Sequence, residues 1–290
     1  RKQLIDAFFI NLNPDDEKFL LERTSDRSKE IAAIAWGWLG QMVKGSEGER
    51  EKGINEIMIS FFHEIKPGKE INWPKELKPL VKAAPAIFTE NPELFLLSIL
   101  DPADTVASDK KTMTSWLNYH EKAGKSRPLH TALVTAGIRH RQVTYLKALV
   151  GQQINSTAQW KEAGRYLSPA DWNELALVLL RHEEDLPENR SYQAMMETSP
   201  LFWTADHAQR FFSRYVEWRM DPMSGIQGSA KAVNEILEKA AVAVPPERVV
   251  EMEKAWNLVA SPFLPQSDPV IGFFDTLEFR NELRKICLRR

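Results

Sequence analysis

The sequence has little of what stabilises secreted proteins or anchors membrane proteins. Its 290 residues include one cysteine, Cys287, which excludes an intrachain disulfide framework. Cys287 follows Leu283 by four residues on an apolar stripe, so we expect a buried, reduced thiol. The longest apolar run, 94–100, is interrupted by Ser98 and is far shorter than the roughly 18 residues of a membrane-spanning helix. We therefore predict a cytoplasmic protein without a membrane segment.

The chain also lacks an excess of charge of either sign. Its formal net charge is −2, with 22 basic and 20 acidic groups in residues 1–150 and 16 and 20 in residues 151–290. Only the last twelve residues are clearly basic, with five Lys or Arg side chains against Glu282. Because a dedicated nucleic-acid-binding protein usually carries a basic stripe or patch, the charge pattern argues against nucleic acid as the main partner.

Recognisable motifs for catalysis, metal binding or cofactor binding are missing. The six histidines are scattered, without a second His or Cys at a ligand spacing. Gly124-Lys125-Ser126 resembles the end of a phosphate-binding loop, but Tyr119 stands where that loop requires glycine. The carboxylates of 183–185 could do acid–base chemistry, although a solvated helix end explains them as well. We expect no catalytic residue, no cofactor and no metal.

What the sequence does contain is a helical pattern of apolar residues. Between 31 and 42 these residues recur at the i, i+3 and i+4 spacing of one helix face, and similar stripes occupy 54–65 and 172–180. Pairs such as Ser168-Pro169 supply the cap and the first-turn proline of new helices. The pattern predicts an all-α fold without strands. The expected helices are 14–24, 27–43, 49–66, 74–88, 91–100, 109–123, 128–150, 156–166, 169–184, 189–197, 204–219, 229–243, 246–259 and 275–289.

Several aromatic residues lie on or beside these stripes. Trp36, Trp38, Trp172 and Trp256 do so, and we expect them to pack between helices. His140 shares a stripe with apolar neighbours, which favours a hydrogen-bonded core or interface histidine over a metal ligand.

The organisation of the helices indicates a repeat protein. Grouped in pairs, they recur roughly every 35 to 45 residues, as in HEAT and armadillo repeats, although no residue-level consensus repeats strictly. We therefore predict a HEAT/armadillo-like α-solenoid of degenerate helix pairs, forming one domain over 1–290 with a weak subdivision into 1–105 and 106–290. The start at Arg1, without Met, indicates the C-terminal part of a longer protein.

The stretch 19–35, with the sequence FLLERTSDRSKEIAAIA, resembles a known unit. It is similar to the "FLE-x-x-L-x-D-R-x-x-x-V-R-x-x-A" unit of an uncharacterised bacterial family of helical-repeat proteins, with Ala32 at the position of the family's second Arg. The resemblance implies company with SWIM zinc-finger proteins and MoxR-type ATPases, which are AAA-type ATPases. It therefore implies an assembly or adaptor role with a protein partner, and it carries over no catalytic residue.

The clearest candidate for a binding surface is the predicted helix 204–219. His207, Arg210 and Arg214 follow at i, i+3 and i+7, so we expect them to share one basic face. Two arginines one turn apart could clamp a carboxylate or a backbone phosphate. Glu217 could instead pair with Arg214 within the helix, which would leave an ordinary solvated face.

A second candidate is the stretch 260–274, which we expect to be non-helical. It carries three prolines among apolar residues, including Phe263 and Phe273. Because such a loop is apolar enough to dock on another surface, we predict that both phenylalanines contribute to partner binding.

Two functions fit these observations. The first is a non-enzymatic helical-repeat scaffold that binds other proteins on one face of its array. The alternative is a nucleic-acid-binding helical solenoid similar to the DNA-alkylation-repeat glycosylases, which would need a continuous basic groove. A third reading, an enzyme with an unrecognised site, would require a cleft with convergent polar groups.

Overall fold

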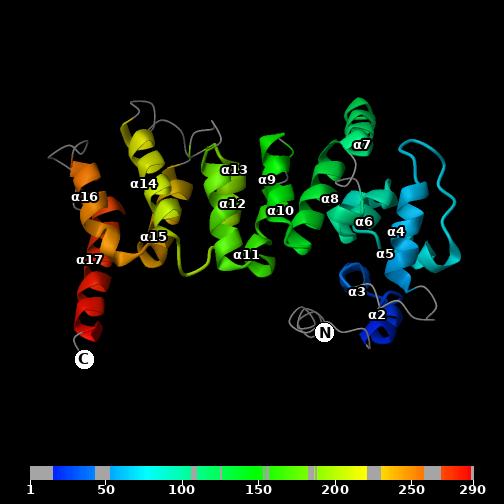
Figure 1. Cartoon of the computed structure of the whole chain (residues 1–290), viewed down its shortest axis with the longest axis horizontal. Coiled ribbons are helices and arrows are strands. Elements are labelled where there is room, and N and C mark those ends of the chain that lie inside the picture. Colours follow the sequence, from blue (N-terminus) through cyan, green and yellow to red (C-terminus); the bar gives the residue numbers. More distant parts are fainter. Residues whose placement is uncertain are drawn as a thin grey trace. The chain divides into compact units, whose positions relative to one another are not determined.

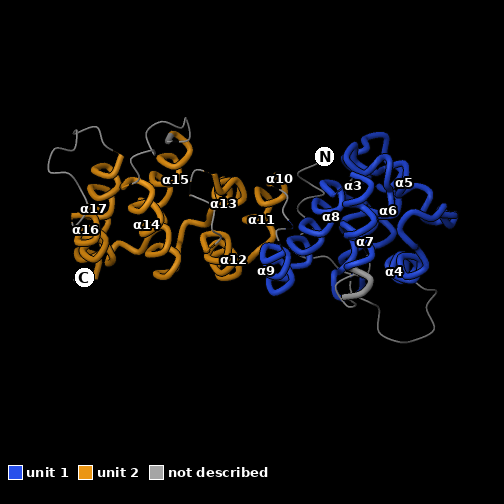
Figure 2. The backbone as a smooth tube through the Cα atoms, turned by 90° about the horizontal axis from the view of Figure 1, so that it is seen from above, with its two compact units in different colours: residues 1–156 blue, residues 157–290 orange. Residues whose placement is uncertain are grey.

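The computed structural model describes most of the chain (Figure 1). The regular elements of the described residues are all helices, which confirms the all-α prediction. The chain divides into two compact units, unit 1 (Arg1–Ser156) and unit 2 (Thr157–Arg290) (Figure 2). The described residues are 16–42, 53–105, 110–124, 126–152, 154, 157–181, 186, 188–220, 230–257 and 269–288.

Unit 1 consists of short helices, several of them 3₁₀ turns. The prediction of one helix over 74–88 was wrong, because Pro79 and Pro85 help to divide this stretch into three short pieces. The elements are α2 (Glu17–Arg23), α3 (Lys29–Leu39), α4 (Ile54–Glu64), η3 (Lys75–Leu77), α5 (Lys78–Ala83), η4 (Ala86–Phe88), α6 (Pro92–Ile99), η5 (Pro102–Asp104), α7 (Lys110–Lys122), α8 (Ser126–Arg139) and α9 (Val143–Gly151).

Helix α6 is the centre of unit 1. Residues 93–99 are all buried, because α3, α4, α5 and α8 pack around this helix. A helix that is apolar on all sides has no solvent face and belongs in a core. A close approach occurs at Gly40, after α3, where a Cβ atom would lie 2.1 Å from the Ile99 carbonyl oxygen. Glycine is therefore the residue that allows α3 to reach α6.

Side chains at the C-terminal end of α8 lie within hydrogen-bond distance of the last carbonyl groups of α6. The Arg139 guanidinium donates a hydrogen bond to the Ser98 carbonyl (3.0 Å), and His140 Nε2 lies 3.0 Å from the Ile99 carbonyl oxygen. These carbonyls belong to the last turn of α6, where helices leave acceptors without an intrahelical partner. The prediction of a hydrogen-bonded histidine at position 140 is confirmed.

The prediction of one helix over 128–150 was wrong. The chain leaves the helix at His140, and Arg141 adopts a left-handed conformation with φ of 56°. The Gln142 N–H then donates to the Gly137 carbonyl oxygen (2.9 Å), so the turn closes α8 before α9 begins. The apolar stripe continues through both helices, so periodicity alone does not reveal the break.

Unit 2 contains both the longest and the shortest of the described α-helices. Asn189 caps α13 by accepting a hydrogen bond from the Tyr192 N–H (3.0 Å), and Ser168 accepts from the Asp171 N–H (3.2 Å) at the start of α12. The elements are α10 (Thr157–Trp160), α11 (Ala163–Tyr166), α12 (Pro169–Arg181), α13 (Arg190–Met196), α14 (Ala205–Met220), α15 (Ala230–Ala243), η7 (Pro246–Arg248), α16 (Val249–Asn257) and α17 (Pro269–Leu288).

The helices of unit 2 pack in alternation. Helix α12 contacts α14 and α14 contacts α16, while α13 contacts α15 and α15 contacts α17. Between α12 and α17 each helix therefore meets the next but one along the chain, and α12 with α13 and α16 with α17 also pack as consecutive pairs. The four tryptophans expected between helices, two in each unit, are all buried: Trp36, Trp38, Trp172 and Trp256.

Helix α17 has apolar residues on two opposite faces. One face is buried, and Arg280 on its edge donates hydrogen bonds to the Ala241 and Val244 carbonyls (2.8 Å each). The opposite face, with Phe279 and Ile286, is exposed. The prediction that Cys287 is buried was wrong, because this end of α17 extends past the residues that cover its first half.

The boundary between the units differs from the subdivision expected at 105/106. Helices α6 and α8 lie on either side of that position, and their contact is the most extensive of any described helix pair. A boundary there would divide the core of unit 1. The structure places the boundary after Ser156.

Candidate partner-binding surface

The basic face predicted on α14 does not form as a set of three residues. His207 is completely buried, whereas Arg210 is exposed. Arg214 is partly covered, and its guanidinium lies 3.2 Å from the Glu217 carboxylate, so the internal pairing that we considered is present. The expectation was wrong for His207, because the buried arc of α14 extends further round the helix than the stripe formed by Phe211 and its apolar neighbours.

His207 belongs to a buried network of neutral polar groups. Its Nδ1 lies 2.9 Å from Asn173 Oδ1, and its Nε2 lies 3.0 Å from the Tyr192 hydroxyl oxygen. The Asn173 amide nitrogen donates to the carbonyls of Pro169 (2.7 Å) and Phe202 (3.2 Å), which assigns Oδ1 as the acceptor. The proton of the imidazole is therefore on Nδ1, and Nε2 accepts from the tyrosine.

Burial controls the ionisation of this network. It lowers the pKa of His207 to about 3 and raises the pKa of the Tyr192 hydroxyl well above its ordinary value. The Trp203 ring stacks on the imidazole with 4.2 Å between ring centroids. Since His207, Tyr192 and Asn173 are all buried, no substrate reaches these groups in this structure. The network joins α12, α13 and α14 and serves as a structural element.

The second predicted candidate, the stretch 260–274, lies only partly within the residues that the structure describes. Phe263 lies outside the residues that the structure describes. Phe273 lies on α17, which begins at Pro269, and it is 2% exposed. Its ring stacks on that of Phe212, with 5.6 Å between centroids and 13° between ring planes. The expectation of an exposed apolar loop was therefore wrong for Phe273, since Pro269 begins the helix, where its missing N–H costs nothing.

Exposed apolar side chains of unit 2 lie on the outer face of α17, described above, and at a second place. The connection between α13 and α14 presents Leu201 and Phe202, which are 68% and 75% exposed, and Val242 on α15 is 52% exposed. Leu201 and Val242 line a groove of about 350 Å³. We call Leu201, Phe202, Val242 and this groove the apolar connection surface. Its signal in the sequence is Ser199-Pro200 followed by two apolar residues, a pattern that fits an ordinary turn equally well.

The backbone that carries these side chains is fixed on both sides. The Trp203 N–H donates to the Ala243 carbonyl (2.9 Å), and its indole Nε1 donates to the Ser199 hydroxyl (2.7 Å). The Phe202 carbonyl accepts from Asn173. Phe202 is therefore held in solvent by an ordered backbone. An exposed aromatic side chain on an ordered backbone is typical of a binding anchor.

The rim of the groove carries both acidic and basic side chains. Glu197 is paired with Lys161 at 2.8 Å, and Lys239 donates to the Met196 carbonyl (3.1 Å) at the end of α13. Glu238 is exposed and makes no ion pair within the described part of unit 2. Its carboxylate is free to meet a positive charge on a partner.

Other kinds of site find no support in the described residues. Nowhere in them do three or more His, Cys, Asp or Glu side chains converge as metal ligands would. None of the helices in the described ranges is both long enough and apolar enough to cross a bilayer.

The described residues form an all-helical protein whose unit 2 exposes apolar side chains on the apolar connection surface and on the outer face of α17. A model described as a family of unknown function, DUF5691, matches residues 95–287, which is about two-thirds of the chain, and the protein belongs to this family. The match begins within α6, so the stretch 19–35 that carries the resemblance noted above precedes it. No curated protein and no solved structure gives a significant match.

Proposed function

We propose that this protein is a non-enzymatic helical-repeat scaffold that binds another protein through the apolar connection surface. The observation that carries the proposal is Phe202, which is largely exposed although hydrogen bonds fix the backbone around it. Keeping a large aromatic side chain in water costs free energy that burial against a partner would recover. Such anchors dominate the binding energy of many protein interfaces.

The helical-repeat part of the proposal rests on unit 2. Contacts between each helix and the next but one, in the series α12, α14, α16 and α13, α15, α17, are what two rows of stacked helices produce. In repeat arrays of this kind, connections between helices align along an edge and often form the binding face. The apolar connection surface includes such a connection, the stretch between α13 and α14.

The chemistry of the surface specifies the kind of partner. A segment with one or two apolar side chains would fill the groove beside Leu201, and a Lys or Arg next to them would meet Glu238. The partners implied by the resemblance, a MoxR-type AAA ATPase or a SWIM zinc-finger protein, are candidates to supply this segment in the cytoplasm. The rim has no excess of positive charge and the chain has a net charge of −2, which disfavours the nucleic-acid alternative.

A peptide selection tests the proposal and does not require the partner to be identified first. Random peptides displayed on phage are selected against the purified chain, and we expect enrichment of sequences that combine apolar residues with Lys or Arg. Phe202→Ser should weaken the binding of an enriched peptide by about tenfold or more. The matched control is Phe279→Ser on α17, since Phe279 is exposed at 65% but lies outside the surface.

Three results would contradict the proposal. These are no enrichment, enriched peptides that bind Phe202→Ser as tightly as the unchanged chain, and an equal loss in Phe279→Ser. Binding to fluorescent duplex or single-stranded DNA, measured in parallel, would favour the alternative if Phe202→Ser abolished it.

A further inference from the structure

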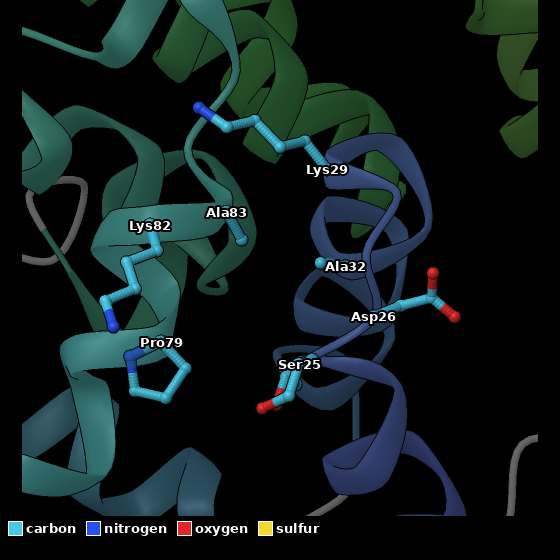
Figure 3. A pocket seen from close by; sticks show the side chains of 8 residues that line it. Ser25, Asp26, Lys29, Ala32, Pro79, Lys82 and Ala83 are labelled. Atoms are coloured by element: carbon cyan, nitrogen blue, oxygen red, sulfur yellow. The ribbon is translucent and has the colours of Figure 1, made fainter.

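Each unit has one surface feature that the proposed function does not use. Unit 1 has a pocket of about 270 Å³ between the turn that joins α2 to α3 and the short helix α5 (Figure 3). Lys29 and Lys82 point to opposite ends of this pocket, so their charges do not converge on one ligand. The feature of unit 2 is the outer face of α17, where apolar and charged residues are ordered along one helix.

The outer face of α17 carries an apolar stripe. Phe279, Leu283 and Ile286 are 65%, 45% and 54% exposed. They follow at i, i+4 and i+7, so they lie on one side of the helix, opposite its buried residues. Every residue from 282 to 288 is exposed, and Figure 1 shows this end of α17 extending beyond the other helices of unit 2. Nothing in the described part of unit 2 therefore covers the stripe.

A row of charged residues runs beside the stripe. Glu278, Glu282 and Lys285 each precede one residue of the stripe, so they lie along one flank of it. Glu282 is paired with Lys285 at 2.6 Å, whereas Glu278 makes no ion pair with the residues that the structure describes. The row is therefore acidic toward the middle of the helix and basic toward its end. Such an order is complementary to itself when a second copy runs in the opposite direction.

We propose that α17 packs antiparallel against α17 of a second copy of this chain. The stripe has the intervals of four and three residues that pair helices in coiled coils, and it places Phe279 opposite Ile286 of the second copy. A two-fold axis between antiparallel helices brings the same flank of each together, so Glu278 of each copy lies opposite Lys285 of the other. The two Glu282 carboxylates meet near the axis, where each has Lys285 of its own chain as a counter-ion.

A parallel pair lacks this complementarity. In that orientation the charged row faces the other flank of the stripe, which carries Arg280 and Cys287. The Arg280 guanidinium is already bound to the Ala241 and Val244 carbonyls, and a thiol is no counter-ion for a carboxylate. The antiparallel pair also avoids collisions, because the buried face of α17 points away from the stripe and the other helices of unit 2 lie on opposite sides of the pair.

Sedimentation of the purified chain over a range of concentrations tests this contact. We expect a reversible dimer with a dissociation constant on the order of 10 μM, since the helix pair is short. Leu283→Ser with Ile286→Ser should weaken dimerisation by about tenfold or more and leave the melting temperature unchanged, because both side chains are exposed. Glu278→Lys should also weaken dimerisation. Glu278→Lys with Lys285→Glu should restore most of it, because the exchange recreates the complementary order.

The control is Phe202→Ser, because Phe202 is 75% exposed and belongs to the apolar connection surface. It should dimerise as the unchanged chain does, while the α17 variants should bind the selected peptides as before, so the two proposals can fail independently. A monomer at all concentrations, an equal loss in Phe202→Ser, or a charge exchange that restores nothing would overturn the proposal. Species larger than a dimer would also overturn it, because an isologous contact closes after two copies.

Discussion

The two units use similar amphipathic helices in different ways. Unit 1 wraps its helices around α6, which is buried from 93 to 99, whereas unit 2 contains no described helix that is buried over its whole length. In unit 2 most helices keep one face for their neighbours and one for solvent, although in α13 only Arg190 is exposed. A central helix makes the stability of a unit depend on one element, while alternating contacts distribute it over several.

The buried histidines of the two units also differ in their surroundings. His140 in unit 1 has a backbone acceptor at Ile99 and the Asp101 carboxylate 3.9 Å from its Nδ1, and both favour the charged imidazole against the effect of burial, which lowers its pKa. His207 in unit 2 has only neutral partners, so burial acts without opposition and its pKa falls to about 3. The identity of the neighbours, rather than burial alone, sets the ionisation of each histidine.

Truncating one large core residue in each unit gives the largest expected effect. Trp38→Ala in unit 1 and Trp160→Ala in unit 2 should each lower the free energy of unfolding by about 4 kcal/mol, because each leaves a cavity at a buried site. Hydrogen exchange should localise the loss to the unit that carries the substitution. Equal acceleration of exchange in both units would refute the division into two independent cores.

The next largest effect is expected from substitutions at glycines where the backbone of another segment approaches closely. A Cβ atom at Gly40 would meet the Ile99 carbonyl, and one at Gly164 would meet the Thr198 carbonyl oxygen in unit 2. Gly40→Ala and Gly164→Ala should each cost about 2 to 3 kcal/mol in denaturant unfolding. Gly151→Ala is the control, because nothing lies within 4 Å of its added Cβ. A loss at Gly151 as large as at the other two would invalidate the explanation by contact.

The pH dependence of stability separates the two histidines. The folded chain resists protonating His207 until pH about 3, while the unfolded chain binds that proton below its ordinary pKa of 6.5. The contribution of His207 to stability is therefore complete above the ordinary pKa of histidine. Below that pH the free energy of unfolding decreases, by about 2 kcal/mol near pH 5. His207→Gln should flatten this decrease more than His140→Gln does. Identical pH profiles for both variants would contradict the contrast between their surroundings.

The smallest effect is expected on the exposed side of α14. The double change Arg210→Glu with Arg214→Glu should alter the free energy of unfolding by less than about 0.5 kcal/mol, since Arg210 is exposed and the Arg214 guanidinium pairs with a surface carboxylate. Thermal unfolding measures this directly. A loss above about 1 kcal/mol would mean that these arginines stabilise unit 2. Binding of peptides from the selection should be unchanged, because the apolar connection surface includes neither residue.

The sequence predicted those features that depend on local periodicity. The stripe at 31–42 became α3, and the tryptophans on stripes became core residues. Features that depend on distant residues were missed. The burial of His207 requires Asn173, which is 34 residues away in the sequence, and no local pattern records that contact. The break at Arg141 was missed because a single residue in a left-handed conformation leaves the apolar stripe intact.

The fixed backbone around Phe202 has a kinetic consequence. A partner that docks there does not have to wait for a loop to order, because hydrogen bonds from Trp203 and Asn173 hold the chain beforehand. Association should then proceed at the rate set by diffusion and orientation. Substitution of Phe202 should shorten the residence time of the complex and leave its association rate nearly unchanged.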